Sequence, residues 1–258
     1  MRTLILTGCT LLLSLVMGAQ TLPQRDTLPF RAGERLEMGI RYRWGAVMSE
    51  VGQAVLRLEQ EDSLFHAECA VRSAPFFDVF YRMREHFQSW FTPGEIRPME
   101  AVRDTYQNGY TAANHFRYDW EQGCIRAQVA YNGLPPEQKN IPLDGYSYDI
   151  VSLIYFLRAV DWNRVAAGEP RSVPFAIDDA VFRVQVTCHG PERFKVRRLG
   201  WRDTLRFSCT VVSGALFSGD QQMQVWFSAD EKHVPLAVMV PLKVGTMWAW
   251  LKSYEQGR

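Results

Sequence analysis

Apolar and polar residues alternate with a period of two along much of the chain. Residues 35–44 show the pattern most clearly, and residues 182–188, 205–211 and 234–240 repeat it. In antiparallel sheets, strands that bury one face and expose the other have this alternation. We therefore expect one face of the first strand to point into the core and the other to lie in water. The expected inward positions are Leu36, Met38, Ile40, Tyr42 and Trp44, and the outward ones include Arg41 and Arg43.

Turn residues separate the alternating segments. Asn108-Gly109 lies between two of them, and Asn-Gly is the preferred two-residue hairpin turn because both residues accept a positive φ. Gly190-Pro191 and Ala229-Asp230-Glu231 separate later segments. Strands that follow one another at roughly ten-residue intervals predict a large antiparallel sheet.

Two segments depart from the alternation. Residues 75–83 are apolar on almost every side, which predicts a short, buried helical turn. Residues 149–161 predict a longer helix, with Asp149 as its N-cap and Leu153, Ile154 and Leu157 among its most buried side chains. A helix that is apolar on nearly every side must be covered on nearly every side. The predicted fold is therefore mainly β: a strongly curved antiparallel sheet (a β-roll or half-open barrel) wrapped around one central helix and a short helical turn.

The first residues predict export. Arg2 precedes an uncharged apolar run of 14 residues, which the small residues Gly18 and Ala19 follow. This order is typical of a cleavable signal peptide, and a membrane-spanning helix would need about 20 residues. We expect residues 1–19 to be the signal peptide, cleaved near Ala19, residues 20–258 to form a single β-roll domain, and no transmembrane span. Cys9 resembles a lipobox cysteine, but the apolar run continues beyond it, which disfavours a lipoprotein.

Charge and cysteine content narrow the range of partners. Without Arg2, the 29 basic residues become 28 and equal the 28 acidic ones. A net charge of zero offers no long-range attraction for nucleic acid or anionic lipid, so we expect no nucleic-acid partner. The cysteines of the mature chain form no CxxC pair and lie in apolar strand contexts, which favours free thiols. They are Cys69, Cys124, Cys188 and Cys209.

Several short motifs follow one another in a familiar order. They are Phe30-x-x-Gly33-Glu34-x-Leu36, Asp149-x-x-Ser152-x-x-Tyr155-x-x-Arg158, Gly190-x-Glu192, Trp226-x-Ser228-x-Asp230 and Val234-Pro235-Leu236. Together they resemble the domain-of-unknown-function family 3108, and the resemblance covers about residues 30–254. It implies an exported envelope protein of a Gram-negative bacterium, built on a rolled antiparallel sheet. The resemblance implies no activity and no catalytic residue.

No segment matches a catalytic or metal-binding motif. The histidines are isolated in sequence, no GxSxG elbow is present, and no glycine-rich loop joins a strand to a helix. We therefore expect no catalytic residue, no metal and no cofactor. Asp178 and Asp179 are adjacent, which favours turn carboxylates over an acid and base pair.

Two groups of side chains are candidates for ligand binding. Tyr155 and Arg158 belong to a polar strip on the predicted helix, which lines a pocket or satisfies buried strand carbonyls; we favour the second. Trp248 and Trp250 alternate on the last strand, with Tyr254 expected on the same face. They pack in the core or line an apolar pocket between sheet and helix. The candidate ligand-binding residues are thus Tyr155, Arg158, Trp248 and Trp250.

Three functions remain open. The leading hypothesis is a non-enzymatic periplasmic binding or carrier module for an apolar ligand, a lipid or an envelope-protein segment. The alternative is an envelope assembly or scaffold protein that binds another protein. The third is a hydrolase whose site is assembled across strands. A continuous apolar cavity would favour the first, a filled interior with exposed apolar side chains the second, and clustered, perturbed carboxylates or histidines the third.

Overall fold

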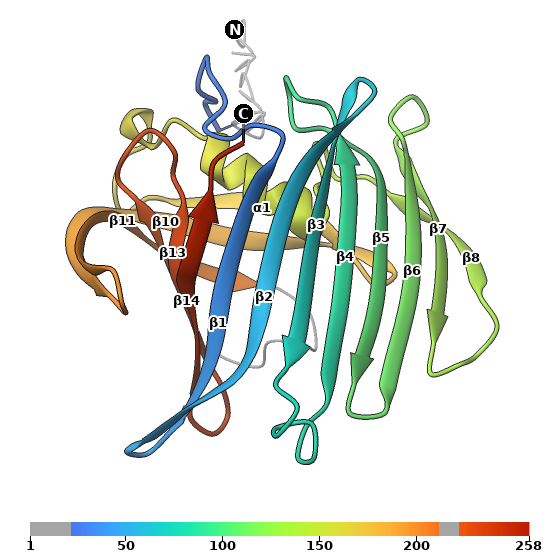
Figure 1. Ribbon diagram of the computed structural model, residues 1–258. Helices are drawn as coiled ribbons and strands as arrows, with labels where there is room; N and C mark the ends of the chain where they lie inside the picture. The colour runs from blue at the N-terminus through green and yellow to red at the C-terminus, as the bar shows by residue number, and fades with distance from the viewer. Residues whose placement is uncertain (1–21, 212–221, 258) are drawn as a thin grey trace, which may run out of the picture.

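A computed structural model of the 258-residue chain describes residues 22–211 and 222–257. The described chain forms one antiparallel sheet of 14 strands, one α-helix and one 3₁₀ turn (Figure 1). The signal peptide expected at residues 1–19 lies outside the described residues. The first eight strands are β1 Glu34–Trp44, β2 Val47–Glu61, β3 Leu64–Ser73, β4 Met83–Phe91, β5 Pro98–Gln107, β6 Tyr110–Asp119, β7 Cys124–Tyr131 and β8 Glu137–Pro142. After α1 (Ile150–Ala159) and η1 (Trp162–Arg164) follow β9 Pro170–Ile177, β10 Ala180–Val196, β11 Gly200–Val211, β12 Met223–Ser228, β13 Pro235–Pro241 and β14 Thr246–Glu255.

The order of the strands shows how the sheet is rolled. It runs β8-β7-β6-β5-β4-β3-β2-β1-β14-β13-β12-β11-β10-β9, so the first and last strands are neighbours in the middle of the sheet. Figure 1 shows α1 behind β1–β3, while β10 and β11 cross behind the front strands. The edge strands β8 and β9 do not pair with each other, so the sheet is curved but open. The predicted rolled sheet around a helix is therefore confirmed.

The first strand tests the predicted register. Leu36, Met38 and Ile40 are buried and face the core, as expected. Tyr42 is only half-buried, and Trp44 is 67% exposed, so the inward prediction was wrong for Trp44. The strand ends at Trp44 in a hairpin that projects beyond the part of the sheet covered by α1, where no core is left to receive the side chain.

On the outward face, Arg43 is exposed as predicted, but Arg41 is half-buried. Its Nη2 donates to the Met48 carbonyl at 3.3 Å. The outward direction of Arg41 is therefore confirmed, whereas its full solvation is not.

The Asn108-Gly109 turn has the predicted form. Both residues have a positive φ, 48° and 101°, and Gln107 and Tyr110 are paired at the ends of the two strands. This short turn fixes the β5–β6 register directly, because two residues leave no room for slippage.

Helix α1 begins as the sequence predicts. The Asp149 carboxylate accepts hydrogen bonds from the backbone N–H groups of Val151 and Ser152 at 2.8 and 3.0 Å. Ser89 on β4 also donates to Asp149, at 2.6 Å, and so ties the cap to the sheet. The helix contacts β3, β4 and β9 on the inner face of the sheet.

The buried side of α1 differs from the prediction. Leu153, Ile154 and Leu157 are only half-buried, whereas the enclosed residues include Ser152, Tyr155 and Arg158. The prediction was wrong because it ranked positions by hydropathy alone. The strands that α1 contacts present buried polar groups, such as Ser89, to the polar side of the helix.

The segment that leads into α1 connects the two edges of the sheet, β8 and β9. Tyr148 pairs with the edge strand β9, donating from its backbone N–H to Pro174 at 3.1 Å and accepting from Ala176 at 2.6 Å. Lys139 on β8 and Asp179 in the β9–β10 turn form an ion pair at 2.7 Å. Asp178 pairs with Arg103, so both aspartates are turn carboxylates, as predicted.

The four cysteines of the described chain are free thiols, in line with the prediction. Burial raises the pKa of Cys69 and of Cys209 to about 12. Cys124 is half-buried.

This difference predicts the order in which the thiols react. Because the thiolate is the reactive form, iodoacetamide should label Cys124 of the native protein well before Cys69 or Cys209. Peptide mass spectrometry over a time course measures the order, and urea-unfolded protein, in which all four should react alike, is the control. Equal labelling of Cys69 and Cys124 in the native state would contradict the predicted burial.

Candidate functional site

Large apolar side chains gather at one end of the sheet. Because the strands alternate in direction, the β1–β2, β3–β4, β5–β6, β7–β8 and β13–β14 turns all lie at this end, at the bottom of Figure 1. Ten of the twelve exposed large hydrophobic residues of the described chain lie in or beside these turns. We call them the apolar end: Trp44, Val47, Phe76, Val79, Phe80, Tyr81, Tyr106, Tyr110, Leu134 and Val244.

The β3–β4 loop contributes the most exposed of these side chains. Val79 and Phe80 are 83% and 76% exposed, so the predicted burial of residues 75–83 was wrong. The predicted helical turn is present: the N–H groups of Asp78 and Tyr81 donate to Ala74 and Phe77 at 3.0 and 2.9 Å. Phe77 alone turns inward and packs against the main core. The loop thus has a defined shape that points its other apolar side chains at solvent.

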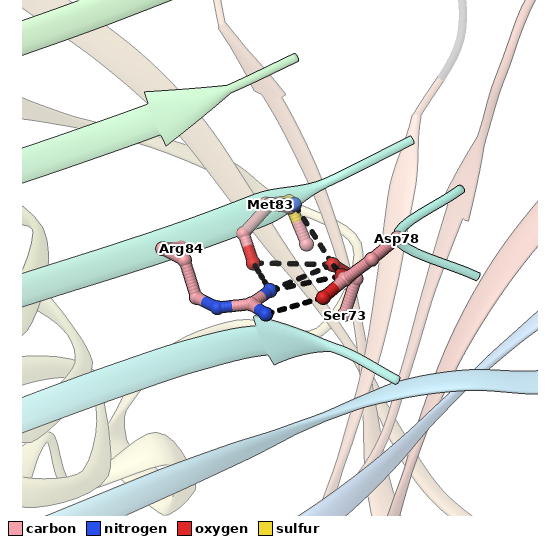
Figure 2. A network of polar contacts seen from close by, with 4 residues as sticks. All are labelled: Ser73, Asp78, Met83 and Arg84. Carbon is pink, nitrogen blue, oxygen red and sulfur yellow. Dashed lines mark hydrogen bonds and ion pairs between the residues drawn. The ribbon is translucent and has the colours of Figure 1, made fainter. Parts of the chain in front are cut away.

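A polar network holds the base of this loop (Figure 2). The Asp78 carboxylate accepts from both terminal nitrogens of Arg84, at 3.0 and 2.5 Å, and also from the buried Ser73 hydroxyl. Arg84 Nη1 donates to the Met83 carbonyl at 2.7 Å, and Met83 N–H donates to Ser73 Oγ at 2.8 Å. The hydrogen bonds from Arg84 and Ser73 lower the pKa of Asp78 to about 2, so the network stays ionised near neutral pH. The loop is therefore fixed at both of its ends.

Charge differs between the two ends of the sheet. At the apolar end, Arg43, Arg82 and Lys243 are exposed, while Asp78 is neutralised by Arg84 and Glu137 pairs with Lys139 at 3.7 Å. Turns at the opposite end carry more acidic than basic residues, for example residues 61–63, 119–123 and 229–232. The exposed apolar side chains are thus accompanied by unpaired positive charge.

The predicted ligand-binding residues of the helix lie in the packed interior. Tyr155 and Arg158 have no exposed surface. The Arg158 guanidinium binds both carboxylate oxygens of Glu34, at 2.6 and 2.8 Å, and its Nε donates to the His233 carbonyl at 3.1 Å. Tyr155 stands edge-on to Phe30, with ring centroids 4.8 Å apart. Arg158 therefore satisfies buried polar groups, which was the second of the two roles considered for the polar strip on the helix.

Trp248 and Trp250 lie on the other face of the sheet. They pair with Arg41 and Gly39 of β1, whereas the inward Ile40 pairs with Ala249. Their rings stack on each other at 4.8 Å, and Phe194 of β10 stacks on Trp226 and Trp250. The structure therefore does not bring Tyr155 and Arg158 together with the two tryptophans.

Tyr254 was expected beside the tryptophans and is not. The β1–β14 pairing shifts register between Glu37 and Met38, which leaves Lys252 as an extra residue. A bulge of this kind reverses the face of every later side chain. Tyr254 consequently points inward and donates to Glu34 at 3.2 Å.

Beside the start of α1 the interior has little free space. A cavity of about 20 Å³ lies between Asn114, Asp149 and Arg103. That volume is enough for about one water molecule. Among residues 22–211 and 222–257, no three His, Cys, Asp or Glu side chains are placed to hold a metal ion. No helix of this part of the chain is long and apolar enough to cross a bilayer.

Comparison with known proteins identifies the family. The family model described as "Protein of unknown function (DUF3108)" matches residues 40–251, so the chain belongs to that family, as the motifs predicted. No curated protein matches the chain. A β-barrel-like protein of the domain of unknown function DUF1849 from Brucella abortus has a similar structure, with a TM-score of 0.60 and 7% identity over 90% of this chain and 100% of that one. A chain from Parabacteroides distasonis with the provisional description of a lipoprotein matches at a TM-score of 0.32 and 11% identity, over 90% and 100%.

The apolar end was missed in the sequence because hydropathy does not distinguish a core residue from an exposed one. A signal was nevertheless present. Apart from Asp78, residues 76–81 are apolar without the period-two alternation of the neighbouring strands, and Arg82 and Arg84 follow them. An aperiodic apolar segment next to charged residues is also what an exposed interaction loop looks like.

Proposed function

We propose that the protein is a non-enzymatic binding module of the cell envelope that contacts lipid through the apolar end of its sheet. The observation that carries the proposal is the gathering of exposed Trp, Phe, Val, Leu and Tyr side chains on turns at one end. The cavity beside the start of α1 holds only about one water molecule, so we propose that the lipid contact lies on the surface. Exposed apolar side chains over a packed interior also suit the alternative, a scaffold that binds another protein, and lipid is preferred for the reasons given below.

The β3–β4 loop supports a functional role for this surface. Burying apolar surface stabilises a protein by about 25 cal/mol for each Å² removed from water, and exposed apolar side chains lack this stabilisation. A loop with no role could turn Phe76 and Phe80 inward or carry polar residues in their place. Here the bonds of Asp78 to Arg84 and Ser73 fix the loop with those side chains outward. A binding surface that is held in shape before contact loses less entropy on binding.

Lipid fits this surface better than a protein segment does. The apolar side chains stand on separate turns, and a bilayer can receive protruding side chains without a matching shape. Tryptophan and tyrosine favour the membrane–water interface, where one end of the side chain is apolar and the other wet. Arg43, Arg82 and Lys243 beside them would meet lipid phosphates.

Export completes the proposal. Residues 1–19 have the order of a signal peptide, and its cleavage would release the β-roll into the periplasm of a Gram-negative bacterium. In that compartment, the apolar end would face a membrane leaflet.

Sedimentation with phosphatidylcholine vesicles tests the proposal. The purified protein, without its signal peptide, should bind, and the double variant Phe76→Ser/Phe80→Ser should bind about 10- to 100-fold more weakly, since each exposed phenylalanine contributes about 1 kcal/mol or more when it enters an apolar phase. Both side chains are exposed, so the variant should fold normally, which a thermal melt checks.

The matched control is Tyr146→Ser/Trp201→Ser. These are the two exposed large hydrophobic residues of the described chain that lie outside the apolar end. The control should bind as the wild type does. Equal losses in the two double variants would contradict the location of the site. A wild type that binds no vesicles would reject lipid and favour the alternative, an envelope-protein partner.

A further inference from the structure

A trough crosses the outer face of the sheet close to the apolar end. It has a volume of about 730 Å³ and is lined by side chains from β1 to β7. Neighbouring strands are about 4.8 Å apart, so the six spacings from β1 to β7 make the trough about 29 Å long. Its direction is across the strands.

The strand pairing explains the shape of the trough. Cross-strand partners lie on one face, and Val55, Ala70, Ala113 and Ala130 belong to a single row that also includes His86 and Asp104. These mostly small side chains form the floor. The row on one side contains Arg35 and Arg57, and the row nearer the apolar end contains Arg72 and Arg84. Longer side chains therefore wall in a floor of short ones.

Two of the four arginines in the β1–β4 half of the trough form no ion pair among the residues that the structure describes. Arg35 pairs with Glu37 at 3.2 Å, and Arg84 pairs with Asp78. Arg57 and Arg72 are exposed and make no ion pair with a carboxylate of the described chain. Arg72 donates from Nη2 and Nε to the neutral Gln53 amide oxygen, at 2.9 and 3.1 Å.

One acidic residue stands within this half of the trough: Glu68 on β3 lies directly opposite Arg57, and its carboxylate is 3.7 Å from His86. Asp104 stands on β5, beyond the arginines. Glu85 points to the inner face and accepts from Thr105 and Gln107 at 2.6 and 2.5 Å. Arg57 and Arg72 together still exceed the charge of Glu68, so the β2–β4 side favours an anion.

The trough adjoins the apolar end. Arg72 is one residue from the end of β3, and Arg84 is one residue from the start of β4. With a rise of about 3.3 Å per residue, both stand just above the β3–β4 loop. If that loop contacts a membrane, these arginines are level with the headgroups, and long arginine side chains extend the reach further.

We infer that the arginine half of this trough holds the phosphate group of an anionic phospholipid, such as phosphatidylglycerol, when the apolar end rests on a membrane. The inference depends on the proposed function and adds the headgroup chemistry to it. Guanidinium groups bind phosphate oxygens in pairs of parallel hydrogen bonds. Arg57 has that capacity free, and Arg72 would exchange its bonds to the neutral Gln53 amide for phosphate. Because the mature chain has a net charge of zero, the arginines attract an anionic headgroup only at short range, when it is already close to the trough.

Vesicle binding by charge variants tests the inference. Vesicles of phosphatidylcholine alone are compared with vesicles of phosphatidylcholine mixed with phosphatidylglycerol. The double variant Arg57→Gln/Arg72→Gln should bind the mixed vesicles about tenfold more weakly than the wild type, because each basic residue near an anionic surface contributes severalfold to affinity. Its binding to phosphatidylcholine alone should change less. Asp104→Asn, which removes the opposing charge, should strengthen binding to the mixed vesicles.

The control variant is Arg197→Gln/Arg202→Gln, which removes the same charge from the exposed β10–β11 hairpin. It should bind mixed vesicles nearly as the wild type does. Equal losses in both double variants would overturn the inference in favour of general charge attraction, and so would a trough variant that binds normally. Both outcomes leave the lipid function standing. A wild type that binds neither vesicle overturns the function and the inference together.

Discussion

Replacing Arg158 with methionine should lower the free energy of unfolding by about 3–5 kcal/mol. The substitution keeps much of the side-chain volume but removes the partner of Glu34, whose carboxylate has no exposed surface. The Tyr254 hydroxyl, at 3.2 Å, would be the side-chain donor left to that carboxylate. A buried charge without its counter-charge is strongly destabilising.

The geometry of the pair shows why the effect should be large. Burial alone would lower the pKa of Arg158, but the hydrogen bonds and charge of Glu34 raise that pKa above its usual value. Arg158 also donates to the carbonyls of His233 and Lys232, at 3.1 and 3.3 Å. One side chain therefore joins the end of α1, the start of β1 and the β12–β13 turn.

Urea unfolding measures this prediction. The double variant Arg158→Met/Glu34→Met should regain much of the lost stability, because it removes both charges. Arg126→Met breaks an exposed ion pair with Asp119 and should change stability by less than about 1 kcal/mol. A loss below about 1 kcal/mol for Arg158→Met alone would show that the Glu34 carboxylate finds another partner.

Truncating Tyr155 to alanine should destabilise the protein by about 3–5 kcal/mol. The ring is enclosed between Phe30 and Phe91, with centroids 4.8 and 5.6 Å away, so its removal leaves a cavity in the main core. Burial also raises the pKa of the Tyr155 hydroxyl well above its usual value. Equilibrium unfolding in urea again provides the measurement.

Tyr155→Phe separates the ring from its hydroxyl. The hydroxyl is buried and makes no hydrogen bond within the described chain. Phenylalanine should therefore cost less than about 1 kcal/mol, and it stabilises the protein if the desolvated hydroxyl is the larger effect. A loss close to that of the alanine variant would mean that the hydroxyl has a partner.

Local patterns in the sequence predicted what local physics determines. Asp149 caps α1 because its side chain reaches N–H groups two and three residues ahead, and Asn108-Gly109 turns because both residues accept a positive φ. The alternation of residues 36–40 follows from the two faces of a strand. Each of these features depends on neighbours in the sequence.

Features that depend on distant residues escaped prediction. Glu34 and Arg158 are separated by 124 positions, and nothing in either segment indicates the other. The extra residue at Lys252 becomes visible only when β14 is paired with β1, so the alternation placed Tyr254 on the wrong face. Trp44 and Phe80 were expected inside because their hydropathy matches a core, whereas exposure depends on whether another element covers them.

The pairing of β1 with β14 is a contact that can form only late in folding. Arg35 lies opposite Glu255, so the middle of the sheet joins the two extremes of the described chain, while most other neighbouring strands are linked by short turns. Two meanders, β1–β8 and β9–β14, can each form from local contacts, but they become one sheet only after the last strand has been synthesised. Contacts this distant in sequence form slowly because a long loop must close first. Until then both β1 and β14 present an unpaired edge, which is a surface prone to pairing with other chains.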